Sequence, residues 1–306
     1  MYQSPKMKAL TFFSLFLLIS VSTIAQDDLM KMLEEETKDK NAINYTTATF
    51  KTTRLINGHS IENVAAGVLD FRISHRFGYV NGGAYELWGL DEASMRLGFD
   101  YGLTKWWMIG VGRSTYQKQY DGFTKIKILH QSTGARTMPV TVSAVGSMMY
   151  KSLHFEDPTR ENYYTSNMYY AGQLLIGRKI SEALSLQLMP SVVHYNLVPL
   201  ATDPNDVLAL GIGGRVKISK RVSVNVEYYY QLPDFQFEGT ENSLAIGFDI
   251  ETGGHVFQLY CTNSTGMTER TFIAETTGDF FSGDIRLGFT ISRVFTIQKP
   301  KELRGM

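Results

Sequence analysis

Charged side chains recur at every second position in several segments of this sequence. Between Asp70 and Phe77, for example, acidic and basic residues alternate with large apolar ones. Alternate residues of an extended chain point to opposite faces, so such a segment separates its charges from its apolar side chains. We expect the charged faces to line a water-accessible interior, and the candidate lining residues are Arg72, Arg76, Arg96, Asp100, Lys125, Lys127, Arg215, Lys217, Glu227, Asp249, Asp284 and Arg286.

Two kinds of chemistry are open to this set of residues. Fixed positive charges along a narrow pore lower the entry barrier for anions, and ionisable groups inside a membrane protein often mark a solute pathway. The set also contains acids, which could instead pair with the bases and neutralise a mostly filled interior. Both interpretations are open from the sequence.

Residues suited to catalysis or metal binding form no recognisable motif. The 6 histidines include no H-x-x-x-H or H-E-x-x-H pair, and the single cysteine, Cys261, excludes a thiolate zinc site. No G-x-S-x-G elbow, phosphate loop or dinucleotide fingerprint occurs. We therefore expect no enzyme, no metal and no cofactor. The 30 basic residues balance 30 acidic ones, so charge gives no reason to expect a nucleic-acid partner.

The residues from 94 to 114 show the element that would position these charges. Apolar residues fall on every second position up to a tight polar turn at Thr104 and Lys105, and Arg96 and Asp100 lie between them. A second alternating run follows the turn. This pattern predicts a β-hairpin with one face toward lipid and the other toward water.

Similar alternation along the chain predicts an all-β fold, a single up-and-down antiparallel transmembrane β-barrel of about twelve strands. Links after the odd-numbered strands are mostly long and those after the even-numbered strands are short. That regularity is typical of an outer-membrane barrel with both termini on the periplasmic side, and a soluble sandwich has no reason to keep it. The expected strands are 67–77, 94–103, 106–114, 123–131, 139–151, 166–180, 184–196, 206–219, 222–232, 243–252, 255–262 and 283–295.

The N-terminal residues predict export. Two lysines precede an uncharged apolar run, and small residues follow up to Ala25. This layout is typical of a cleaved signal peptide at residues 1–25, with either Met1 or Met7 as its start. No later run of about 18 apolar residues would form a membrane-spanning helix. We expect the exported chain in the outer membrane of a Gram-negative bacterium.

The remaining residues divide into three parts. Residues 26–66 are expected in the periplasm, with a short helix at 27–41 and a polar segment at 45–56 that lies inside or beneath the barrel. The helix is interpreted either as a solvated lead-in or as a docked plug or partner-binding element. The barrel is expected over 67–297, followed by a periplasmic tail at 298–306.

Aromatic residues near the ends of expected strands are interpreted as membrane-interface residues, because amphipathic rings gather at both surfaces of a bilayer. The lipid bilayer of the outer membrane is thus one expected partner, and a small solute is another. The interface candidates are Trp106, Trp107, Phe280, Phe281 and Phe295.

Three runs carry a resemblance to a known family. VLDFRISHRFG, RLGFDYGLTKWWMIGVGRS and IRLGFTISRVFTIQKPKE are similar to segments of a Bacteroidota group of outer-membrane β-barrel proteins classed as a domain of unknown function. The resemblance covers nearly the whole mature chain. It implies a barrel in the outer membrane and supplies no substrate and no catalytic residue.

Two functions are compatible with these features. The first is a narrow pore or transporter for small polar or anionic solutes, as the inward basic residues favour. The alternative is a non-conducting barrel scaffold that binds a partner through its long loops or its N-terminal helix. The sequence predicts neither the solute, the partner, the gating nor the oligomeric state.

Overall fold

The computed structural model describes residues 42–155, 159 and 161–298. The expected signal peptide, the helix at 27–41 and nearly all of the expected tail at 298–306 lie outside these residues. Within the described residues, no helix combines the length and apolar character that a membrane crossing requires.

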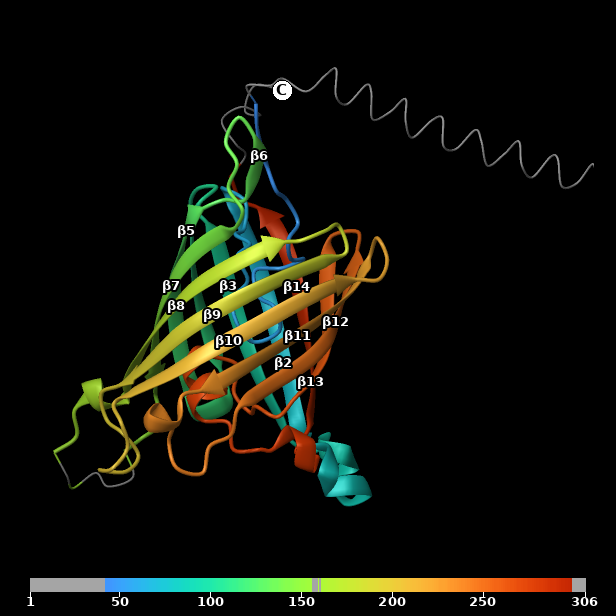
Figure 1. Ribbon diagram of the computed structural model, residues 1–306. Helices are drawn as coiled ribbons and strands as arrows, with labels where there is room; N and C mark the ends of the chain where they lie inside the picture. The colour runs from blue at the N-terminus through green and yellow to red at the C-terminus, as the bar shows by residue number, and fades with distance from the viewer. Residues whose placement is uncertain (1–41, 156–158, 160, 299–306) are drawn as a thin grey trace, which may run out of the picture. The chain divides into compact units, whose positions relative to one another are not determined.

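Twelve antiparallel strands form a closed barrel, because the last strand pairs with the first (Figure 1). This confirms the fold class predicted from alternation and link length. In order around the barrel the strands are β2 (Val68–Tyr79), β3 (Ala93–Gly102), β4 (Trp107–Ser114), β5 (Gln119–Leu129), β7 (Thr141–Lys151), β8 (Met168–Lys179), β9 (Leu184–Tyr195), β10 (Asp206–Lys217), β11 (Val222–Gln231), β12 (Ser243–Thr252), β13 (His255–Thr262) and β14 (Arg286–Thr296).

Side chains alternate between a buried inner face and an exposed outer face along these strands. In β9, Ser185, Gln187 and Met189 are buried, whereas Leu186 and Leu188 are each 46% exposed. An outer face of exposed leucines is suited to contact lipid rather than water. Closure of the barrel also pairs the backbone groups of every strand, as a membrane interior requires.

Three of the tight turns share one local structure. Thr104 Oγ1 accepts hydrogen bonds from the backbone N–H groups of Trp106 and Trp107, at 3.3 and 3.1 Å. Ser181 and Ser219 accept from the residues two and three positions later in the same way, at 3.1 to 3.3 Å. A hydroxyl that replaces a backbone acceptor favours such turns. The barrel end that carries these turns is called the turn end below, and the opposite end the loop end.

Most links of the loop end are long, although the link between β4 and β5 spans only residues 115–118. The loop-end links contain the 3-10 segments η1 (Val80–Gly89), η2 (Tyr116–Lys118), η3 (Tyr164–Asn167) and η4 (Pro233–Phe235), and the link from β13 to β14 contains the π-helical turn η5 (Arg270–Ala274) and the 3-10 turn η6 (Phe280–Ser282).

Most strand boundaries lie within about two residues of the sequence prediction, and two strand starts differ by more. β5 begins at Gln119 rather than at residue 123, which extends the strand toward the loop end. β14 begins at Arg286 rather than at residue 283, because Gly283 adopts a left-handed conformation (φ 94°) that closes η6. Asp284 therefore lies in the link before β14.

A separate two-stranded sheet was not predicted from the sequence. It pairs β1 (Ile43–Tyr45) with β6 (Ser132–Gly134). Ala135 N donates to Ala42 O at 3.1 Å beside it.

Residues 45–66, called the plug below, run inside the ring of strands (Figure 1). The plug begins at the turn end, where Thr46 N donates to Gln131 O at 2.8 Å, and it returns there, where Ala66 bridges to Gly102. Between these points it forms a hairpin, in which Arg54 pairs with His59 around an Asn-Gly turn. An Asn-Gly pair favours such a tight turn.

Candidate functional site

The tip of the plug is held by a buried carboxylate of the barrel wall. Glu227 on β11 is fully buried, and it accepts hydrogen bonds from the backbone N–H groups of Ile56, Asn57 and Gly58, at 3.1, 2.8 and 3.2 Å. Three donors on one carboxylate offset much of the cost of burying its charge. Glu227, one of the predicted lumen residues, thus holds the turn of the plug.

Two basic residues of the wall hold backbone carbonyl groups of the plug. The fully buried ammonium group of Lys125 donates to the carbonyl oxygens of Thr53, Ser60 and Glu62, at 3.2, 3.0 and 2.5 Å. Arg215 Nη1 donates to the carbonyl oxygens of residues 48 and 49, at 2.8 and 2.7 Å. In this conformation the two basic side chains therefore bind the plug and are not free to line a path for a solute.

Two uncharged wall residues make similar contacts that the sequence analysis missed. Gln187 Nε2 donates to His59 O at 2.7 Å, and its Oε1 accepts from Ile61 N at 2.9 Å. Gln258 Nε2 donates to Leu55 O at 2.8 Å. Both glutamines are inward residues of alternating strands, and that position was the only signal that could have identified them.

Glycines in the wall leave room for the apolar side chains of the plug. A Cβ atom added to Gly213 on β10 would lie 2.7 Å from Leu55 Cδ1, and one added to Gly177 on β8 would lie 2.7 Å from Ile61 Cδ1. Leu55 and Ile61 are each 1% exposed. The wall around them is largely apolar on β7 to β10, where the buried inward residues include Met149, Tyr169, Leu175, Met189, Val193 and Val207.

A second segment meets the plug from the loop end. Residues 263–279, called the inner loop, connect β13 to β14 and contain the fully buried η5. Glu269 Oε1 lies 3.1 Å from Arg54 Nη1 and 3.2 Å from His59 Nε2. Phe272 packs against Tyr229 with the ring centroids 5.1 Å apart. The plug and the inner loop thus close the lumen together.

Burial and charge determine the ionisation of the groups between these segments. Burial, and then the nearby Arg54 guanidinium, lower the pKa of His59 well below its ordinary value, so this imidazole is neutral. Burial alone would raise the pKa of Glu269, but Arg54 and His59 bring that pKa well below its ordinary value. The junction is therefore an Arg54–Glu269 ion pair beside a neutral histidine.

Arg76 on β2 joins the plug to the inner loop. Its Nη2 donates to Asn57 Oδ1 at 2.5 Å, and its Nη1 donates to the carbonyl oxygens of Ser264, at 3.0 Å, and Gly266. Arg270 of the inner loop, which the sequence analysis also missed, lies over the Tyr169 ring at 3.9 Å. These contacts attach the inner loop to both walls of the lumen.

Two further predicted lumen residues meet the plug at Thr53. Its hydroxyl donates to Asp100 Oδ2 at 3.0 Å and accepts from Arg72 Nη1 at 3.4 Å. Arg72 also lies 3.8 Å from Asp70 and donates to Gln258 Oε1 at 3.1 Å. The polar side of the lumen, on β2 and β3, is thus a connected network rather than a set of isolated charges.

Other predicted lumen residues contact the wall or lie at its ends. Arg96 is paired with Asp121, and Asp249 accepts from Gln258 at 2.9 Å. The guanidinium of Arg286 lies 3.6 Å from the centroid of the Tyr79 ring at the loop end. The two remaining lysines of the set, Lys127 and Lys217, are half-buried near the turn end.

Asp284, which was predicted to line the lumen from a strand, lies outside the strands. It accepts from Asn81 Nδ2 at 2.6 Å and from Asp279 N at 3.1 Å, both in links of the loop end. The alternation continues through Asp284 in the sequence, but the left-handed Gly283 stops the strand from reaching it. Asp284 therefore braces two loops and is no inward residue of a strand.

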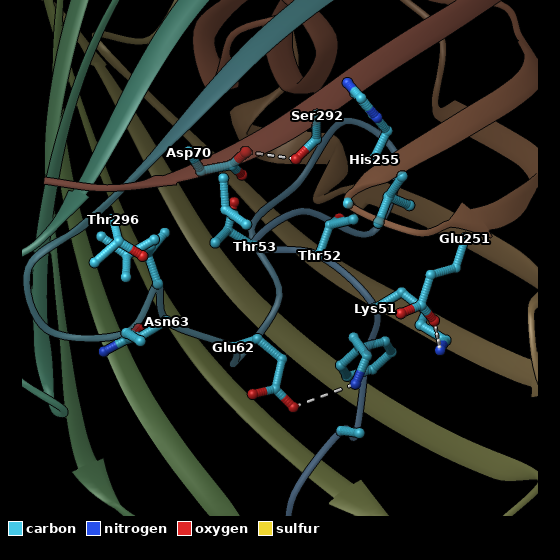
Figure 2. Close-up of a pocket in the computed structure, with 18 residues that line it drawn as sticks. Lys51, Thr52, Thr53, Glu62, Asn63, Asp70, Glu251, His255, Ser292 and Thr296 are labelled. Carbon is cyan, nitrogen blue, oxygen red and sulfur yellow. Dashed lines mark hydrogen bonds and ion pairs between the residues drawn. The ribbon is translucent and has the colours of Figure 1, made fainter. Parts of the chain in front are cut away.

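A cavity of about 510 Å³ separates the plug from the walls formed by β2, β12, β13 and β14 (Figure 2). Its lining includes Asp70, which accepts from Ser292 Oγ at 2.5 Å, and the Lys51–Glu251 ion pair. Glu62 also lines it and accepts from the backbone N–H of Thr49 at 2.8 Å. Gly254 and Thr296, at the turn end, also line the cavity.

The predicted interface aromatics occupy both ends of the barrel. Trp106, Trp107 and Phe295 are 52%, 37% and 40% exposed near the turn end, and Trp107 Nε1 donates to Thr124 Oγ1 at 2.8 Å. Phe280 and Phe281 belong to η6 at the loop end, where Phe281 is 86% exposed. Among the described residues, no group of three or more His, Cys, Asp or Glu side chains is arranged to hold a metal ion.

The model of the family described as "Membrane bound beta barrel domain (DUF5777)" matches residues 50–295. No curated protein matches the chain. Among solved structures, the chain is similar to the NanC porin in a rhombohedral crystal form, with a TM-score of 0.46 and 11% identity over 74% of this chain and 98% of that chain.

Two further solved structures are similar. The KdgM porin in complex with disordered oligogalacturonate has a TM-score of 0.46 and 10% identity, over 74% of this chain and 99% of that chain. The COG4313 outer membrane channel from Pseudomonas putida F1 has a TM-score of 0.39 and 12% identity, over 77% of this chain and 98% of that chain.

Proposed function

The chain belongs to the family of membrane-bound β-barrel domains DUF5777, and from this premise we propose that it is an outer-membrane channel closed by its own plug. Displacement of the plug opens a path for small polar or anionic solutes. The proposal includes export through the predicted signal peptide and an orientation with the turn end in the periplasm.

The observation that carries this proposal is the space that the wall leaves for the plug. A barrel of about eight strands can fill its interior with its own side chains, and a barrel of more strands is wider. Here Gly177 and Gly213 leave volume that Leu55 and Ile61 take up, and Lys125 and Glu227 bond to the plug rather than to each other. An interior built around a separable segment supports gating by that segment.

A second function remains as an alternative, because aromatic side chains are exposed on the loop-end links. Tyr85 is 94% exposed, Tyr164 is 70% exposed and Phe281 is 86% exposed. Exposed aromatic residues are favoured anchors in protein interfaces. They support a barrel that holds a partner without conducting.

Solute uptake by proteoliposomes separates the two functions. The full chain is reconstituted as wild type, as the plug variant Leu55→Ala/Ile61→Ala, and as the control Leu90→Ala/Ile180→Ala, whose two positions are each 52% exposed. Each buried truncation costs about 2–5 kcal/mol of packing, so the plug is loosened while the wall is unchanged.

We expect chloride and glucose to enter only the proteoliposomes that carry the plug variant. A folded plug variant that stays as impermeable as the wild type would contradict the channel and favour the scaffold. Crosslinking in intact cells that returned only monomer would contradict the scaffold.

A further inference from the structure

We propose that the lumen is a binding site for short peptides, which it recognises through their main chain. The inference rests on the proposed channel function and names its class of solute. The plug itself shows the chemistry, because it is a peptide segment seated against the wall of the barrel.

Five wall residues bind the plug through atoms that every peptide carries. Lys125, Arg215 and Gln258 donate to backbone carbonyl oxygens, and Glu227 accepts from backbone N–H groups. Gln187 does both, at His59 O and Ile61 N. None of these hydrogen bonds depends on the identity of a plug side chain.

The contact made by Gln187 resembles the pairing of two β-strands. A side-chain amide that accepts from one residue and donates to the carbonyl two residues earlier reproduces the donor and acceptor spacing of a neighbouring strand. Main-chain hydrogen bonds of this kind give affinity for extended peptides, and nearby pockets give selectivity for their side chains. Gln187 is therefore suited to bind extended peptides of many different sequences.

The side-chain pockets are apolar. The spaces beside Gly177 and Gly213 hold Ile61 and Leu55, next to Leu175 on β8. An oligosaccharide has no apolar branch to fill these spaces, and a small inorganic anion would meet the carboxylate of Glu227 without a donor to offer it. A peptide with aliphatic side chains satisfies both the polar groups and the pockets.

Binding is measured in detergent by equilibrium dialysis, which does not require conduction. The receptor is the full-length plug variant Leu55→Ala/Ile61→Ala, whose wall is intact. The probes are trileucine, trileucine with methylated backbone amides, and maltotriose. Loss of one or two hydrogen bonds is expected to weaken binding about tenfold. Trileucine should thus bind about tenfold more tightly than the methylated peptide, and maltotriose more weakly still.

Matched wall variants identify the site. In the same background, Gln187→Leu should weaken trileucine binding about tenfold. Gln173→Leu should leave it unchanged, because Gln173 is a buried lumen glutamine that donates to Ser191 Oγ at 2.9 Å within the wall. If Gln187→Leu does not fold, Gln258→Leu takes its place.

Equal affinity for the three probes, or equal effects of Gln187→Leu and Gln173→Leu, would overturn the peptide inference. Selective binding of trileucine by a plug variant that stays impermeable in proteoliposomes would support the peptide site and contradict the channel. Permeation without selective binding would support the channel and contradict the peptide site. The two proposals therefore fail separately.

Discussion

Acidification should loosen the plug through His59. This imidazole is fully buried, and the groups that face it are Arg54 of the plug, Glu269 of the inner loop and Lys125 of β5. Burial and Arg54 lower its pKa in the closed state. In an open state with the plug released, the imidazole would face water and its pKa would return toward the ordinary value. A base with a lowered pKa binds fewer protons in the closed state, so closure is most stable above about pH 6.5 and weakens as the pH falls below that value.

The upper limit of the effect follows from the pH interval below the ordinary pKa of histidine, about 6.5. An imidazole that stays neutral in the closed state and titrates normally in water destabilises the closed state by about 1.36 kcal/mol per pH unit, so by up to about 2 kcal/mol at pH 5 relative to neutral pH. This is about thirtyfold in the population of the open form. The pKa of Glu269 is depressed, so its contribution is lost only below about pH 4.3, outside this window.

Hydrogen exchange of the plug amides measures this shift. The N–H groups of Asn57 and Ile61 are bound by Glu227 and Gln187, and they should exchange up to about thirtyfold faster at pH 5, after correction for the intrinsic rate. The variant His59→Gln should remove most of this pH dependence. An equal pH dependence in wild type and His59→Gln would refute the reasoning.

Three further predictions concern the plug, the junction and the turns. Gly213→Val should push against Leu55 and destabilise closure by about 1–3 kcal/mol, seen as faster exchange of plug amides; unchanged exchange would contradict the packing described for this glycine. Glu269→Gln should leave Arg54 with a buried unpaired charge and lower the free energy of unfolding by about 3–5 kcal/mol. The control Glu182→Gln removes an exposed ion pair at the turn end and should lower it by less than about 1 kcal/mol. Equal losses in the two variants would show that the junction is no buried ion pair. Ser219→Ala should remove the acceptor of a tight turn and lower the free energy of unfolding by about 1 kcal/mol in urea, and no loss would contradict the role given to that hydroxyl.

The barrel was predictable because its signal is local. Alternation between Leu186 and Gln187, or between Arg72 and Ile73, needs only neighbouring residues and the period of a strand. Three of the tight turns were predictable for the same reason, since each of these places Thr or Ser at the position where its hydroxyl accepts from the chain. Strand ends were less predictable, as the left-handed Gly283 shows.

The plugged lumen was only partly predictable because its contacts are distant and use the main chain. Glu227 and Asn57 are 170 positions apart, and the atom that Glu227 binds on Asn57 is a backbone nitrogen. Charge identified Lys125 and Glu227 as inward residues but not what they bind. Gln187 and Gln258 carry no charge, and Glu269 and Arg270 belong to a link without a periodic pattern.

Single-channel recording of the full-length protein tests the central claim that the plug closes the lumen. The wild type should show no current, and Leu55→Ala/Ile61→Ala should show discrete openings, because only the packing of the plug has changed. Leu90→Ala/Ile180→Ala should behave as the wild type. Openings of equal size and frequency in all three proteins, or none in a folded plug variant, would contradict the account.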